Sequence, residues 1–268
     1  MTHRCRDCND KPVFSLRHGT ILAESRIFYR KWTIAIYLHS TNLKGISPMK
    51  LHREVDISQK SAWFMLQRLR KATESNESMF SGSVEVDEIF VGRKRKNMSN
   101  SKRKELKDVG RGAVGKTVVI GAKDRKTNNI RAESVAGTDA RTLQDFVVRH
   151  VNKDVAVYTD EARAYESLPC IHESVKHSVS ECVQDQAHTN GMESFRALMK
   201  RGYIGVYHKI LPKHLDRHVS EFEHRHNIRG PDTVDQMINV VQGMLGKRLT
   251  CKHLIADNEL DSGAKPIA

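Results

Sequence analysis

The chain has 268 residues, and 38% of them are hydrophobic, which is enough to bury a sizeable aliphatic core. No apolar run reaches the about 18 residues of a membrane span, and the opening MTHRCRDCND lacks the apolar segment of a secretory signal. The formal net charge of +13 favours a polyanionic partner, and nucleic acid is the first candidate.

The N-terminal segment carries the one cysteine motif, Cys5-x-x-Cys8. A structural zinc needs four ligands, the usual second cysteine pair is missing, and the spacing of His3 and His18 is not diagnostic. We therefore interpret residues 1–22 as a partial zinc-ribbon remnant and leave Zn²⁺ at Cys5 and Cys8 as an open alternative. Five scattered cysteines without a signal segment indicate a reducing compartment, so we expect a cytoplasmic protein at the nucleoid.

Residues 23–76 have the pattern of a small all-helical domain. Helices are expected over 25–40, after the cap Ser47-Pro48, and after Ser58. Two helices joined by a tight turn, with a basic second helix, form a helix-turn-helix DNA-binding domain, although a bundle with a solvated basic face has the same pattern. The outward face of the last helix is expected to present Gln59, Lys60, Gln67, Arg68, Arg70 and Lys71.

Residues 80–250 change to a pattern of strands interrupted by helices. This order describes an α/β domain with a mixed sheet, and we expect residues 251–268 to form a loose tail. A polar, basic loop is expected after Gly92, and a capped helix begins at Thr138. The expected strands cover 84–91, 117–124, 130–136 and 154–160.

Two aspartates lie where strands should be buried. Asp87 lies within VEVDEIFV, and Asp160 ends DVAVYTD. A buried carboxylate costs free energy unless it is paired or binds a metal, and a divalent cation would remove the repulsion between two facing acids. Two alternatives stay open, because Glu88 points to the opposite face of the same strand and Asp160 could merely cap the next helix.

The segment HTNGMESFRALMKRG predicts an amphipathic helix that would complete this site. Asn190, Glu193 and Lys200 share one face, with Lys200 about 10 Å further along the axis, within reach of a phosphate. Three oxygen donors favour Mg²⁺ or Mn²⁺, and paired ions of this kind catalyse phosphodiester chemistry. Asn190 is an alternative third ligand, and Glu193 could instead be a surface acid paired with Lys200 or Arg196.

Five stretches, in order, carry a family resemblance over most of residues 10–250. The chain resembles bacterial insertion-sequence transposases of the DDE type that have a zinc ribbon and a helix-turn-helix before an RNase H-like domain, a group related to eukaryotic Merlin elements. The stretches are KGISPMKLHREVDISQKSAWFMLQRLR, VEVDEIFVG, YTDEARAY, HTNGMESFRALMKRGYIGVYHK and HLDRHVSEFEHRHNIR. The missing zinc-ribbon pair and the loop RKRKNMSN depart from the pattern.

The resemblance implies an enzyme that cuts phosphodiester bonds at the ends of its own element and joins the freed ends to target DNA. It implies Asp87, Asp160 and Glu193, with Asn190 as the alternative, as ligands of Mg²⁺ or Mn²⁺, and Lys200 as a catalytic cation. Double-stranded DNA is the implied partner, with a homo-oligomer formed on it. The DNA-binding residues that we expect are Gln59, Lys60, Arg68, Arg70, Lys200 and Arg201.

Two other functions are weighed against this one. A non-catalytic DNA-binding regulator would show the same helices and charge. A zinc hydrolase using His214 and His218 is disfavoured, because Asp216 stands between them in place of the glutamate of an HExxH motif.

Overall fold

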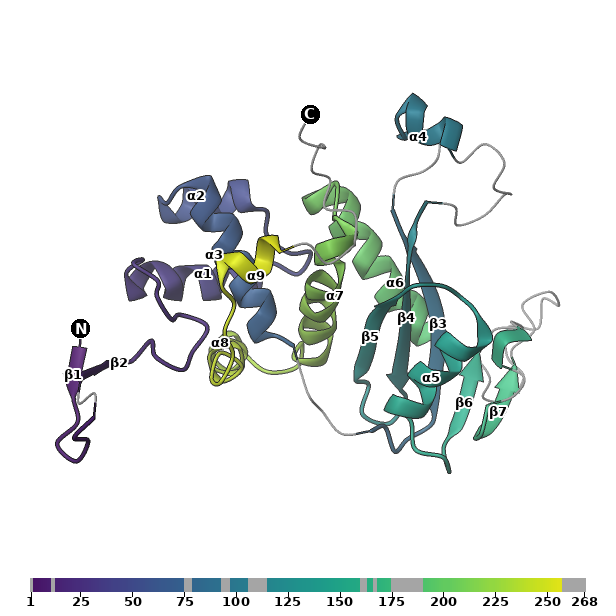
Figure 1. Ribbon diagram of the computed structural model, residues 1–268. Helices are drawn as coiled ribbons and strands as arrows, with labels where there is room; N and C mark the ends of the chain where they lie inside the picture. Colours follow the sequence, from purple (N-terminus) through teal and green to yellow (C-terminus); the bar gives the residue numbers. More distant parts are fainter. Residues whose placement is uncertain are drawn as a thin grey trace. The chain divides into compact units, whose positions relative to one another are not determined.

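The computed structural model describes residues 2–10, 13–74, 79–92, 97–105, 115–159, 163–165, 168–174 and 190–256 (Figure 1). These residues form two compact units. Met1–Ser75 and Ile228–Glu259 make a helical unit, and Asn76–Asn227 make up the main part of a unit built on a sheet. Among the helices described, none combines the length and the apolar character needed to cross a membrane.

In its described residues, the helical unit contains a short hairpin and five helices. Side chains define its helix starts, because Ser47 accepts a hydrogen bond from the Lys50 N–H and Ser58 accepts one from the Ser61 N–H. Asp56, at φ 51°, makes the left-handed turn between these two helices. The elements are β1 (Thr2–Arg4), β2 (Val13–Ser15), α1 (Tyr29–Thr41), α2 (Pro48–Val55), α3 (Gln59–Ala72), α8 (Thr233–Gln242) and α9 (Cys251–Ile255).

The end of the sheet unit differs from the expected boundary at residue 250. The structure ends this unit at Asn227 and groups the following residues with the N-terminal helices. The reason is burial, since Val240, Met244 and Leu254 pack into the same core as Trp32 and Leu66. Because Leu254 is fully buried, the first residues of the expected C-terminal tail also belong to this core.

Three side chains of α3 differ from the expected outward orientation. Gln67, Arg68 and Arg70 are buried, whereas Gln59 and Lys60 are exposed. Arg68 donates from Nε to the carbonyl oxygen of Leu249 at 3.3 Å, and its guanidinium carbon lies 4.4 Å from the centre of the Phe64 ring. A guanidinium with an acceptor and an aromatic face can be buried, so helix position alone does not make these arginines available to a partner.

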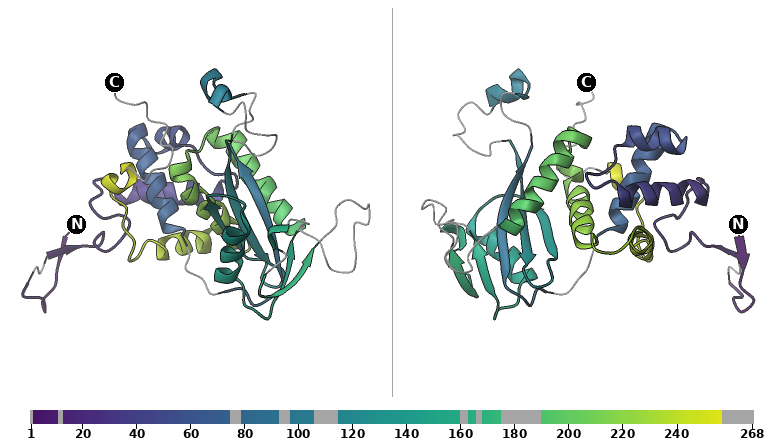
Figure 2. Two further views of the ribbon diagram at one scale, coloured as in Figure 1. Left: turned by 45° about the vertical axis from the view of Figure 1, so that its right-hand side comes forward. Right: turned by 180° about the vertical axis from the view of Figure 1, so that it is seen from behind.

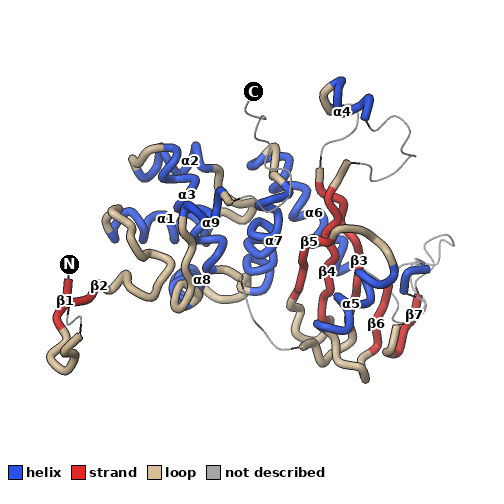
Figure 3. The backbone as a smooth tube through the Cα atoms, in the orientation of Figure 1, coloured by secondary structure: helices blue, strands red, loops and turns tan. Residues whose placement is uncertain are grey.

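The second unit is built on a five-stranded mixed sheet of order β5-β4-β3-β6-β7 (Figure 3). The strands β3, β4 and β5 pair antiparallel, and β6 and β7 are each parallel to their neighbours. This confirms the expected α/β fold, an RNase H-like mixed sheet flanked by helices. The strands are β3 (Val84–Val91), β4 (Thr117–Asp124), β5 (Ile130–Val135), β6 (Ala156–Thr159) and β7 (Ile171–Ser174).

Helices cover both faces of this sheet (Figures 1 and 2). Val84 and Val86 of β3 pack with α5 on one face, and Ile89 packs with α6 and α7 on the other. The alternation along β3 therefore sorts its side chains between two separate cores. The helical elements are α4 (Asn100–Glu105), α5 (Ala140–His150), a 3₁₀ turn (Arg163–Tyr165), α6 (Asn190–Gly202), a π-helical turn (Tyr203–Tyr207) and α7 (Pro212–Asn227).

The edge strand β5 is covered by polar side chains of α7. The outward N–H groups of Ile130, Ala132 and Ser134 would otherwise have no strand partner. They donate to Asn227 Oδ1 at 2.8 Å, Glu223 Oε2 at 3.1 Å and Asp216 Oδ1 at 2.9 Å, respectively. These three acceptors fall on one face of a helix, so the polar residues of HLDRHVSEFEHRHN close the edge of the sheet.

Candidate active site

Asp87 lies on the face of the sheet that α6 covers. It stands in the middle of β3, opposite Gly121 of β4, and its residue surface is 8% exposed. Arg196 of α6 donates from Nη2 to Asp87 Oδ1, and also to the Glu88 carbonyl oxygen at 2.9 Å. The carboxylate is therefore held by a cation, as a nearly buried acid requires.

Glu88, the alternative to Asp87, faces the other way. Its carboxylate accepts a hydrogen bond from the hydroxyl of Tyr165, which is fully buried in the core beneath α5. Asp87 and Glu88 thus lie on opposite faces of the sheet. Of the two acids, Asp87 is the one that shares a face with α6.

The helix α6 packs its apolar side on the sheet and presents a polar flank. Met192, Phe195 and Met199 are buried in the core with Ile89. Glu193 and Lys200 are exposed. At about 100° per residue, Glu193, Arg196 and Lys200 lie along the same flank of the helix, and the contact of Arg196 with Asp87 turns this flank toward β3.

Two of the expected ligands are described only in part or not at all. Asn190 begins α6, but its side chain lies outside the described part of the chain. Asp160 lies outside the described residues and follows Thr159, the last residue of β6. Within the residues that the structure describes, no cluster of three acidic, histidine or cysteine side chains is suited to a metal ion.

Glu85 is a residue of this region that the sequence analysis did not single out. Only 2% of its surface is exposed, and its Oε2 accepts the N–H groups of Gly191 and Met192 at 2.9 and 3.2 Å. Its Oε1 accepts Arg125 Nε at 2.9 Å. The signal was present in the alternation of VEVDE, which places Glu85 and Asp87 on the same face of the strand.

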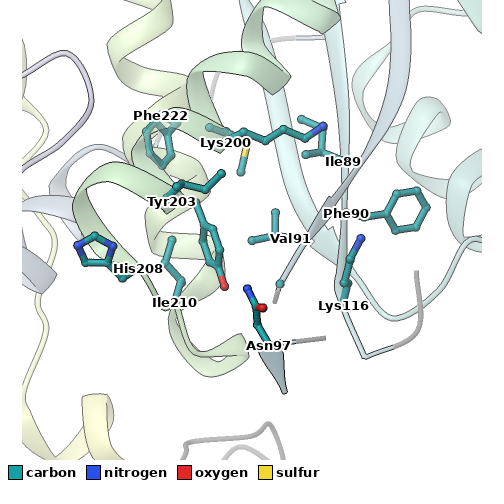
Figure 4. A pocket seen from close by; sticks show the side chains of 13 residues that line it. Ile89, Phe90, Val91, Asn97, Lys116, Lys200, Tyr203, His208, Ile210 and Phe222 are labelled. Atoms are coloured by element: carbon teal, nitrogen blue, oxygen red, sulfur yellow. The ribbon is translucent and has the colours of Figure 1, made fainter. Parts of the chain in front are cut away.

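Beyond Asp87 along β3, the same face borders a cavity of about 870 Å³ (Figure 4). Apolar residues of β3, α6 and α7 line it, and Lys200, Lys116, Tyr203 and His208 contribute polar groups. Lys200 therefore extends beside an amphipathic cavity, which is also lined by Lys116, the residue just before β4.

Other expected site residues are not among the described residues that line this cavity. Arg201 is exposed at the end of α6. Cys5 and Cys8 belong to the N-terminal segment, where hydrogen bonds from the Asp7 N–H and from Cys8 lower the pKa of Cys5, and the bond to Cys5 raises the pKa of Cys8. The buried His218 stacks edge-on against Tyr207, with ring centres 4.5 Å apart.

Comparison with known proteins identifies the sheet unit. The ISXO2-like transposase domain family matches residues 79–227, more than half of the chain and nearly the whole long segment of the sheet unit. A protein of Halobacterium salinarum, described as an "Uncharacterized protein in transposable element ISH50", is 27% identical over 234 residues, which cover 84% of this chain and 78% of that protein. The chain therefore belongs to the ISXO2-like transposase domain family.

Proposed function

We propose that the protein is a DDE-type transposase that cuts phosphodiester bonds at the ends of its element and joins the freed ends to target DNA. The observation that carries the proposal is the meeting of Asp87 with the polar flank of α6, which also bears Glu193 and Lys200. This meeting occurs inside the domain that matches the transposase family. The relative named for a transposable element supports the same role.

The proposed metal ligands are Asp87, Asp160 and Glu193, with Asn190 as the alternative to Glu193. The pairing of β3 with β6 supports the first two, because Val84 lies opposite Val157 and Glu85 opposite Tyr158. Asp87 comes three residues after Val84, and Asp160 comes three residues after Val157. Continued parallel pairing of the two segments would therefore bring the two aspartates opposite each other.

This donor set fits Mg²⁺ or Mn²⁺, since it consists of hard oxygen ligands and includes an acid that already attracts a cation, Arg196. Two such ions, when bound, supply activation of the attacking oxygen and stabilisation of the leaving oxygen.

The remaining residues hold the DNA. Lys200 is exposed on the same flank as Glu193, where its ammonium can bind a phosphate beside the scissile bond. Arg201 follows it on the same helix. Attack first by water and then by the freed 3′-hydroxyl needs no covalent protein intermediate, so no nucleophilic side chain is required of the chain.

The helical unit is proposed to recognise the element ends. Gln59 and Lys60, exposed at the start of α3, are the side chains available to base edges and phosphates. Because two element ends must be held together, we propose that the protein acts as a homo-oligomer on DNA.

A cleavage assay on labelled element ends tests the proposal. The unchanged protein is expected to cut with Mg²⁺ or Mn²⁺ and to stop with EDTA. Asp87→Asn, Asp160→Asn and Glu193→Gln are each expected to lower the rate more than about 100-fold, the upper end of the effect of removing outer-shell partners of a metal. DNA binding should remain.

The matched control is Asp145→Asn, which changes an exposed acid of α5 on the other side of the sheet. This variant should cut at the normal rate. If the unchanged protein binds element ends but does not cut them, whichever divalent ion is added, the chain is a non-catalytic DNA-binding regulator. Full activity of Glu193→Gln together with loss in Asn190→Ala would assign the third ligand to Asn190.

A further inference from the structure

The first turn of α6 rests on a carboxylate of β3. Glu85 lies two residues before Asp87 on the same face of the strand, and its Oε2 accepts the Gly191 and Met192 N–H groups at 2.9 and 3.2 Å. The first N–H groups of a helix have no partner within it, and they carry the positive end of the helix dipole. A buried carboxylate in this place makes charge-assisted hydrogen bonds, which are about twice as strong as neutral ones.

The other oxygen of this carboxylate is also bound. Arg125 donates from Nε to Glu85 Oε1 at 2.9 Å, and its guanidinium carbon lies 4.0 Å from the centre of the Tyr158 ring. Tyr158 lies opposite Glu85 in the pairing of β3 with β6. Glu85 thus joins the strand that bears Asp87, the strand that leads to Asp160 and the helix that bears Glu193.

At its second residue α6 lies so close to the sheet that a side chain there would displace Lys123 and Glu85. A Cβ atom on Gly191 would lie 2.5 Å from Lys123 Nζ and 2.8 Å from Glu85 Oε2. One residue later, Met192 is so close to the sheet that a Cβ on Gly121, opposite Asp87, would lie 2.5 Å from its Cε. The two glycines therefore allow the start of α6 to lie directly against β3 and β4.

We propose that Glu85 is a positioning residue of the metal site, acting through the first turn of α6. The inference rests on the proposed function, because Asn190 and Glu193, the two candidates for the third ligand, both belong to this turn. Glu85 and Asp87 are about 7 Å apart along the rigid strand, so binding of the turn by Glu85 sets the distance from that turn to Asp87. Glu85 is not proposed as a ligand itself, since both its oxygens already accept hydrogen bonds.

The test is a Mg²⁺ titration of cleavage by Glu85→Gln, a change that keeps the size of the side chain and removes its charge. The Mg²⁺ concentration for half-maximal rate is expected to rise about 10- to 100-fold, as for other partners that orient metal ligands. The maximal rate at saturating Mg²⁺ should stay close to that of the unchanged protein. A purely structural role would lower the maximal rate through the folded fraction and leave the half-saturating concentration unchanged.

A matched control and a milder variant complete the test. Glu133→Gln removes another ion-paired glutamate of the same sheet, bound to Arg149, and should leave the Mg²⁺ dependence unchanged. Glu85→Asp keeps the charge but shortens the side chain, so a smaller rise of the same kind is expected. If Glu85→Gln does not fold, the Mg²⁺ titration of Glu85→Asp decides the question.

Amide hydrogen exchange of the metal-free protein tests the contact without catalysis. The Gly191 and Met192 amides are expected to exchange faster in Glu85→Gln than in the unchanged protein. Faster exchange with an unchanged Mg²⁺ requirement would overturn the positioning role, and unchanged exchange would overturn the contact itself. Failure of the proposed function looks different, because the unchanged protein would then not cut element ends, or Glu193→Gln and Asn190→Ala would both cut normally, whatever the exchange shows.

Discussion

Arg196 and a divalent cation should compete for Asp87, and the variant Arg196→Gln tests this. In the structure the Arg196 guanidinium donates to Asp87 Oδ1, and the two side chains are 33% and 11% exposed. If Asp87 binds Mg²⁺, this ion pair must open first. Removing the charge of Arg196 should therefore lower the Mg²⁺ concentration that gives half-maximal cleavage.

The magnitude follows from the exposure of the pair. Two unit charges about 4 Å apart attract by about 4 kcal/mol at an effective dielectric constant near 20. Solvent reaches a third of Arg196, so the net contribution is reduced to about 1 kcal/mol, the upper part of the range for exposed pairs. Since about 1.4 kcal/mol corresponds to a factor of ten, the half-saturating Mg²⁺ concentration should fall about fivefold.

The assay is the initial rate of end cleavage against Mg²⁺ concentration, at constant ionic strength. Arg201→Gln is the control, because it removes an exposed cation from the same helix. It should weaken DNA binding and leave the Mg²⁺ requirement unchanged. A half-saturating concentration that rises or stays constant in Arg196→Gln would show that the arginine does not occupy the place of a metal.

Three further predictions concern stability. Phe195→Ala empties a fully buried position beneath α6 and should lower the free energy of unfolding by about 3–5 kcal/mol, measured by urea denaturation. Glu223→Ala leaves the Ala132 N–H of β5 without its acceptor, which should cost about 1–3 kcal/mol and speed exchange of that amide, whereas stability equal to the unchanged protein would contradict the edge contact. Hydrogen bonds from the N–H and hydroxyl of Thr142 lower the pKa of Asp139. The ionised Asp139 carboxylate therefore stabilises the fold at pH values above its usual pKa of about 3.9, and this stabilisation is lost as the pH falls through the lowered pKa. Asp139→Asn should remove this part of the acid dependence of stability, measured by urea titrations at several pH values.

Local patterns predicted the elements well, because each is governed by short-range physics. The apolar alternation of β3 and the serine caps of α2 and α3 depend on residues near in sequence, and the structure has all of them. Which face of β3 meets α6 depends on contacts about 100 residues away. Which of Asp87 and Glu88 shares a face with α6 therefore cannot be read from the strand pattern alone.

The differences from expectation have the same origin. Arg68 counts as a surface cation in a helical wheel, yet a carbonyl from Leu249, far along the chain, allows its burial. The return of α8 and α9 to the N-terminal core is also non-local, so residues 228–250 were expected in the sheet domain and residues 251–256 in a loose tail. Glu85 was overlooked because its partners, the N–H groups of α6, cannot be read from side-chain types.

The hydrogen bonds between β5 and the side chains of α7 limit the insertions and deletions that α7 tolerates. Adding or deleting one codon between Asp216 and Asn227 would rotate part of the helix by about 100° and remove acceptors from the strand, whereas surface loops absorb such changes readily. Insertions and deletions among related sequences should therefore be absent from this helix, and the number of residues between Asp216 and Asn227 should be constant.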